Sequence, residues 1–158
     1  MTLLLAVVPW LCPVDDDSFT VTLAFERMHC DECKAELDAS LKKMTGVRLV
    51  TFIAASAVVV FDEKSALPPF NRLPKDLNLR VVTLAIRGTV SFAGEKATLV
   101  ARSGSTYALV NPDKSKTDPL GDLKKKLGGK SRFTVTGAIG ADGKTIALQS
   151  FQTSDWKD

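Results

Sequence analysis

The sequence predicts an α+β protein in which a βαββαβ unit is followed by a small β-barrel. Residues 18–27 alternate between apolar and polar side chains, which is typical of a half-buried strand. Apolar residues then recur at helical spacing after Asp31, and five strand-like runs separated by glycines follow Ile86. With 158 residues, 45% hydrophobic and 25% charged, the chain has a globular composition and room for two small domains.

The first predicted strand covers residues 18–27. Its apolar side chains fall at every second position, so they share one face, and its polar side chains share the other. The apolar face comprises Phe19, Val21, Leu23 and Phe25. We expect this face to lie against the core.

A helix is predicted after the first strand. Asp31 is a suitable residue to cap its amino terminus, and Gly46 is suitable to end it. Apolar residues at intervals of four, four and three form one stripe: Cys33, Leu37, Leu41 and Met44. This stripe is expected to face a sheet.

Two strand-like runs at 47–52 and 57–61 predict a hairpin, since both are rich in β-branched and aromatic residues. A second, shorter helix is predicted around residues 69–73, among three prolines that disfavour it. A strand at 79–85 completes the unit. The resulting order, βαββαβ over residues 18–85, is that of a ferredoxin-like sandwich.

The remaining chain, residues 86–158, predicts a small OB-like β-barrel. Its five strand-like runs are 87–92, 96–102, 106–110, 132–139 and 145–151, and Asp142-Gly143 marks a hairpin turn. A short one-sided helix at 119–127 separates the third run from the fourth. Three strands, a helix and two strands is the element order of an OB-fold. The boundary between the two domains is predicted near residues 86–88.

Residues 1–17 are interpreted as a degraded or truncated signal-like segment. Leu3 to Val14 is apolar, but no Lys or Arg precedes it, and Pro9 and Pro13 interrupt it. The run is too short to span a bilayer. This segment favours export to a periplasm or cell envelope over a cytoplasmic location, and it leaves the role of Cys12 open.

Charge and composition indicate neither a nucleic-acid-binding protein nor an enzyme. The net charge is +3, with nine Lys or Arg against eleven Asp or Glu in residues 1–85, and twelve against seven in residues 86–158. That balance lacks the dense basic patch of a nucleic-acid binder. The chain has a single histidine, no phosphate-cradling glycine loop and no interpretable carboxylate pair, so we expect no catalytic site.

The candidate functional site is the pair Cys30 and Cys33, which lies where the first strand gives way to the first helix. Two cysteines separated by two residues can bind a soft metal ion, and they can also form a disulfide or a redox dithiol. A closed zinc site needs four ligands, and no second cysteine pair supplies them. His29 is interpreted as a solvent-facing loop residue and Lys75 as a solvated lysine in the turn before the 79–85 strand.

Residues 18–85 resemble the heavy-metal-associated domain of copper chaperones, copper ATPases and mercury-binding proteins. The resemblance rests on Met28-x-Cys30-x-x-Cys33 after a strand, Leu37 and Leu41 on the helix, and Gly46-Val47 leading into the hairpin. It implies that Cys30 and Cys33 are the metal ligands, most often for Cu(I), with Zn, Hg and Cd as other ions. It also implies that Met28 packs beneath the loop without binding metal.

The sequence therefore predicts a protein that binds a soft metal ion for handling or delivery. Such a protein is expected to exchange the ion with a metal-donating or metal-accepting protein. Two other functions remain open at this point. One is thiol–disulfide exchange at the same pair, and the other is an adaptor whose carboxy-terminal barrel binds an unknown ligand.

Overall fold

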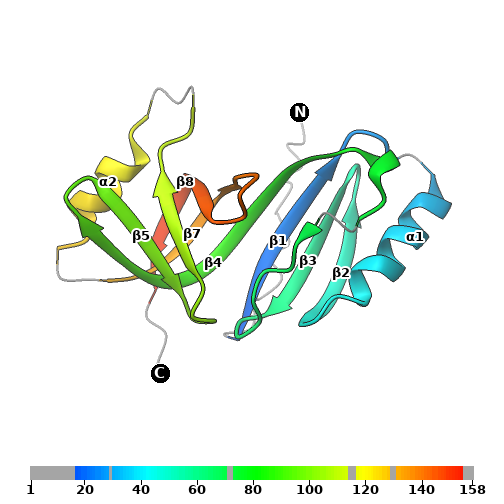
Figure 1. Cartoon of the computed structure of the whole chain (residues 1–158), viewed down its shortest axis with the longest axis horizontal. Coiled ribbons are helices and arrows are strands. Elements are labelled where there is room, and N and C mark those ends of the chain that lie inside the picture. Colours follow the sequence, from blue (N-terminus) through cyan, green and yellow to red (C-terminus); the bar gives the residue numbers. More distant parts are fainter. Residues whose placement is uncertain (1–16, 29, 71–72, 114–116, 129–130, 155–158) are drawn as a thin grey trace, which may run out of the picture.

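The protein is built on one continuous sheet (Figure 1). The structure, a computed structural model, describes residues 17–28, 30–70, 73–113, 117–128 and 131–154. The strand order in the sheet is β2-β3-β1-β4-β5-β6-β8-β7, and β4 also pairs with β7. The strands at one end are covered by a helix, and those at the other end curl into a barrel.

The amino-terminal part contains β1 (Ser18–Phe25), α1 (Asp31–Lys42), β2 (Val47–Ile53) and β3 (Ser56–Asp62). All pairings among its strands are antiparallel. The apolar face of β1 predicted from the sequence is buried, and it belongs to the same hydrophobic core as Leu37 and Leu41 of α1, which are fully buried. The rings of Phe19 and Phe61 stack with centroids 5.2 Å apart, which joins β1 to β3 within this core.

The carboxy-terminal part is a closed five-stranded barrel of β4 (Leu79–Ala93), β5 (Lys96–Ala101), β6 (Thr106–Val110), β8 (Thr145–Thr153) and β7 (Arg132–Ile139). It closes because β4 pairs with both β5 and β7. The helix α2 (Pro119–Lys126) buries Leu123 against it. This architecture is consistent with the expected OB-like barrel.

Two glycines allow the barrel strands to approach one another closely. A Cβ atom at Gly88 would lie 2.5 Å from the carbonyl oxygen of Val100 in β5, and one at Gly137 would collide with the carbonyl oxygen of Ala147 in β8. Any larger residue would force neighbouring strands apart. These positions fix where β4 and β7 pack tightly against their neighbours.

The predicted ferredoxin-like βαββαβ sandwich is wrong. The fold is mostly β, with a closed five-stranded barrel and extra strands. Among the described residues between β3 and β4 there is no α-helix. Phe70 has a 3₁₀ conformation, and the 3₁₀ turn η2 (Lys75–Leu77) precedes β4. Residues 71–72 of the predicted second helix lie outside the described residues. Pro68, Pro69 and Pro74 explain the difference, because proline lacks the N–H that a helix interior needs.

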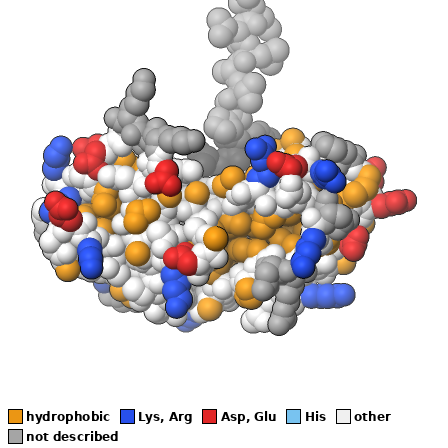
Figure 2. All heavy atoms as spheres, turned by 45° about the horizontal axis from the view of Figure 1, so that its top comes forward, with side chains coloured by type: hydrophobic (Ala, Val, Ile, Leu, Met, Phe, Trp, Pro, Cys, Tyr) orange, Lys and Arg blue, Asp and Glu red, His pale blue; other side chains and the backbone are white. Residues whose placement is uncertain are grey.

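The segment after β3 instead lies over the start of β4 and leaves a groove of about 760 Å³. Its apolar lining includes Leu67, Phe70, Val82 and Ile139, and the turn between β7 and β8 forms its far wall. Figure 2 shows apolar side chains gathered in a hollow on this face of the molecule. An extended segment buries less of a sheet than a helix does, so part of this apolar surface stays open.

The predicted units 18–85 and 86–158 meet inside β4. Residues 79–85 of this strand pair with β1, residues 88–93 pair with β5, and residues 83–89 pair with β7. Leu84 and Ile86, on either side of the predicted boundary, are both buried. The two parts are therefore joined through an unbroken strand as well as through side chains.

A buried ion pair adds a second connection between the two parts. Glu63, just after β3, is only 3% exposed, and its Oε2 accepts a hydrogen bond of 2.9 Å from Nη1 of Arg102, just after β5. Its other oxygen, Oε1, has no hydrogen-bond partner among the described residues. Burial raises the pKa of the Glu63 carboxyl, and the nearby Arg102 and Arg87 guanidinium groups oppose that shift.

We expect Arg102→Ala to destabilise the protein by about 3 kcal/mol at neutral pH, because it leaves the Glu63 carboxylate buried without its partner. A carboxyl whose pKa is raised is charged only above that pKa. The loss should therefore shrink as the pH falls and Glu63 takes up a proton. Urea denaturation of the variant and wild type across acidic and neutral pH measures the difference in the free energy of unfolding.

Lys42→Ala is the matched control, since Lys42 pairs with Asp38 at the surface of α1. This substitution should lower the free energy of unfolding by less than about 1 kcal/mol. A loss for Arg102→Ala that is the same at every pH would contradict the role given to Glu63.

Candidate functional site

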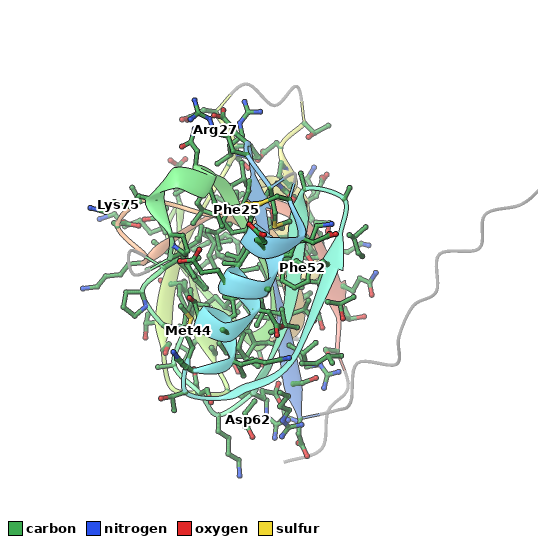
Figure 3. The ribbon with its side chains drawn as sticks, turned by 90° about the vertical axis from the view of Figure 1, so that its right-hand side faces the viewer. Phe25, Arg27, Met44, Phe52, Asp62 and Lys75 are labelled. Atoms are coloured by element: carbon green, nitrogen blue, oxygen red, sulfur yellow. A yellow bond between two sulfur atoms is a disulfide. The ribbon has the colours of Figure 1, made fainter. Side chains whose placement is uncertain are left out.

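The cysteine pair lies at the amino-terminal end of α1, directly after β1. The chain that joins β1 to α1 is hydrogen-bonded to the turn that precedes β4. The N–H of Glu26 donates to the carbonyl oxygen of Asn78 (3.1 Å), and the N–H of Arg27 donates to that of Leu77 (3.2 Å). Figure 3 shows Arg27 and Phe25 near this end of α1, with Met44 near the opposite end. Backbone bonds to a distant segment therefore hold the start of the loop.

Met28 anchors the loop to the hydrophobic core. Its side chain is only 2% exposed and belongs to the hydrophobic core. The burial that the family resemblance implied for this residue is therefore confirmed. Since Met28 is held in the core, the chain that follows is directed outward to the surface, where Cys30 is exposed.

Cys30, rather than Asp31, caps the helix. Its Sγ accepts a hydrogen bond of 3.1 Å from the N–H of Cys33, and its carbonyl oxygen accepts from the N–H of Lys34. Asp31 is the first helical residue, so its predicted capping role is wrong. Asp is the better cap by residue type, but the anchoring of residues 26–28 places the extended capping conformation at Cys30.

The two sulfur atoms are bonded to each other as a disulfide, and the Cα atoms lie 5.3 Å apart. Cys30 is exposed, whereas Cys33 is partly buried and packs against the core. The pair is therefore already arranged for both sulfurs to meet at one point at the surface. In the reduced form the same backbone offers two thiols to a single ion.

The start of α1 favours negative charge on sulfur. The N–H groups of the first helical turn have no partner within the helix, and the helix dipole is positive at this end. The N–H of Cys33 already points at Sγ of Cys30, so a thiolate there would receive a charge-assisted hydrogen bond. Asp31 and Glu32 are exposed and act in the opposite sense, because carboxylates next to thiolates repel them.

The described residues offer no further ligands beside the pair. No group of three or more His, Cys, Asp or Glu that could hold a metal ion occurs in the described part of the chain. His29 and Cys12 lie outside the described residues. Among the described residues, the pair thus offers two sulfur atoms as donors, and two sulfur donors fit an ion of low coordination number.

The turn beside the loop was only partly predicted. Lys75 is exposed in η2, in keeping with its interpretation as a solvated lysine. The sequence analysis missed Asn78, which takes a left-handed conformation (φ 50°) and whose side-chain amide donates to Glu26. The residue type could have indicated this role, since asparagine is one of the few residues that tolerate a left-handed conformation at the end of a short helix.

Comparisons with known proteins return no match for this chain among family models, curated proteins or solved structures. None of the helices described here is long and apolar enough to span a membrane.

In the reduced protein, we expect Cys30 to react with iodoacetamide faster than Cys33. Cys30 is exposed and its sulfur accepts the N–H of Cys33, while Cys33 is partly buried. Peptide mass spectrometry after brief alkylation measures the two rates. Unfolding in urea is the control and should bring the rates together. A faster reaction at Cys33 in the folded protein would contradict the described arrangement.

Proposed function

We propose that the reduced protein binds one soft metal ion, Cu(I) in the first place, between the Sγ atoms of Cys30 and Cys33. The ion is cargo to be handled or delivered. The observation that carries this proposal is a pair of cysteines at the anchored start of a helix. Cys30 is exposed, and the described residues contain no group of three or more His, Cys, Asp or Glu that could hold a metal ion.

The donor set selects among metals. Soft thiolate ligands prefer soft ions such as Cu(I), and two ligands satisfy an ion that accepts low coordination. Hg and Cd are soft enough to compete for the same sulfurs. A structural zinc site is closed by four ligands, so zinc fits this pair less well. Low coordination at an exposed position also leaves the ion accessible to an incoming ligand, as transfer requires.

The charge around the loop supports transfer to another protein. A Cu(I) ion held by two thiolates carries a net negative charge, which the amino terminus of α1 stabilises. Asp31 and Glu32 add two exposed carboxylates beside it. A metal-donating or metal-accepting partner that presents a basic surface around its own thiols would be steered toward this end of the molecule.

The test is anaerobic titration of the reduced full chain with Cu(I) in the presence of a competing chelator. Wild type should retain one ion, and Cys30→Ser and Cys33→Ser should each lose it, because one thiolate cannot hold the ion against the chelator. Cys12→Ser is the matched control and should bind as wild type does. If wild type holds the ion no more tightly than the two site variants, the proposal fails.

A second function, thiol–disulfide exchange, is favoured by one observation: the two sulfurs are bonded to each other. The disulfide form cannot bind a metal through its thiolates, so the redox state decides between the two activities. The reduction potential of the pair and its rate of exchange with glutathione test this alternative. A potential in the range of structural disulfides, together with no exchange, would count against it.

A further inference from the structure

The strand β2 forms an open edge of the sheet. It stands at one end of the strand order, and among the described residues it pairs only with β3. In an edge strand, alternate N–H and C=O groups point away from the sheet, where they can pair with another strand. The pairing of β2 (Val47–Ile53) with β3 is irregular between Val47 and Leu49, and the regular stretch of residues 49–53 is long enough to form such a pairing.

The side chains of β2 leave this edge unprotected. Leu49, Thr51 and Ile53 are exposed on one face; Leu49 is 54% exposed and Ile53 is 62% exposed, the two highest values among the exposed large hydrophobic residues described. Val50 and Phe52 point to the other face and pack against the core, and Figure 3 shows Phe52 beside α1.

The residue types that usually prevent edge pairing are scarce in this strand. It contains no proline and no lysine, and its one charged residue, Arg48, pairs with Asp62 at 2.8 Å. Natural proteins commonly block exposed edges with such residues or with a covering segment. The edge is therefore suited to accept a strand.

We propose that β2 pairs antiparallel with β2 of a second copy of this chain, with the two-fold axis passing through Thr51. In this register Leu49 lies opposite Ile53 of the second copy, and Val50 lies opposite Phe52. Every large apolar residue of the strand interior then faces an apolar residue, and such cross-strand pairs stabilise a sheet. Arg48, at the irregularity of β2, and Ala54, in the turn after the strand, lie outside the paired stretch, and residues 49–53 carry no charge, so no like charges face each other.

The self-complementary order of residues identifies the second copy as the partner. A two-fold pairing uses the same edge of both chains and closes on itself, so it ends at a dimer and leaves no free β2 edge. The other exposed large hydrophobic residues described, Val81, Val100 and Val110, belong to β4, β5 and β6, and each of these strands has neighbours on both sides. These positions therefore serve as controls.

Sedimentation velocity of the full chain over a range of concentrations tests the proposal. Wild type should form a dimer, Leu49→Lys and Ile53→Glu should each remain monomeric, and the control Val110→Lys should form the dimer. Combining Leu49→Lys with Ile53→Glu should restore the dimer, because the introduced lysine of one copy then faces the introduced glutamate of the other. Positions 49 and 53 lie about 13 Å apart along one strand, too far to pair within a copy.

The restored dimer should weaken as salt is added, since it depends on exposed charge pairs. Circular dichroism checks that each variant folds, and the two single variants give independent readings if one of them unfolds. A monomeric wild type, wild-type species larger than a dimer, a dimer that survives both single substitutions, or a double variant that stays monomeric would overturn the proposal.

Discussion

The structure depends on the pairing of β4 with three other strands. Its first half pairs with β1, its second half with β5, and its middle also pairs with β7, so one strand belongs to the sheet under α1 and to the barrel. The barrel closes only while β4 keeps both partners. The Glu63–Arg102 pair lies where β3 and β5 end, and it reinforces the same junction with a contact between side chains. A change at this junction would disturb both parts together.

The same strand positions the cysteine pair. The turn that leads into β4 supplies the carbonyl oxygens of Leu77 and Asn78 that hold Arg27 and Glu26, and the burial of Met28 fixes the next residue. Cys30 then caps α1 through its sulfur. The site therefore combines an exposed cysteine with a loop that is held by backbone hydrogen bonds and by a buried side chain. This arrangement keeps the two sulfurs together without enclosing the ion they would bind.

Much of the local structure was predictable because the spacing of apolar residues shows which side chains are buried. This spacing is two in a strand and three or four in a helix. The strand at Ser18–Phe25, the stripe containing Leu37 and Leu41, and the helix after Asp118 all followed from that spacing. The fold class was not predictable in this way. The apolar residues near Phe70 suggest a helix, but the adjoining prolines prevent one. The closure of the barrel depends on β4 meeting β7 across more than forty residues of chain, and residue order does not encode such pairing directly.

The position of the cysteine pair was predictable from the sequence, but the residue that caps the helix was not. Cys30 and Cys33 followed from their spacing at the end of a strand, whereas the capping residue depended on bonds to Leu77 and Asn78, which are distant in sequence.

The central claim is that this loop holds a soft ion through two sulfurs alone. X-ray absorption spectroscopy of the reduced, Cu(I)-loaded protein tests it most directly. The account predicts two sulfur neighbours at the copper, and a third sulfur or a nitrogen ligand would contradict it.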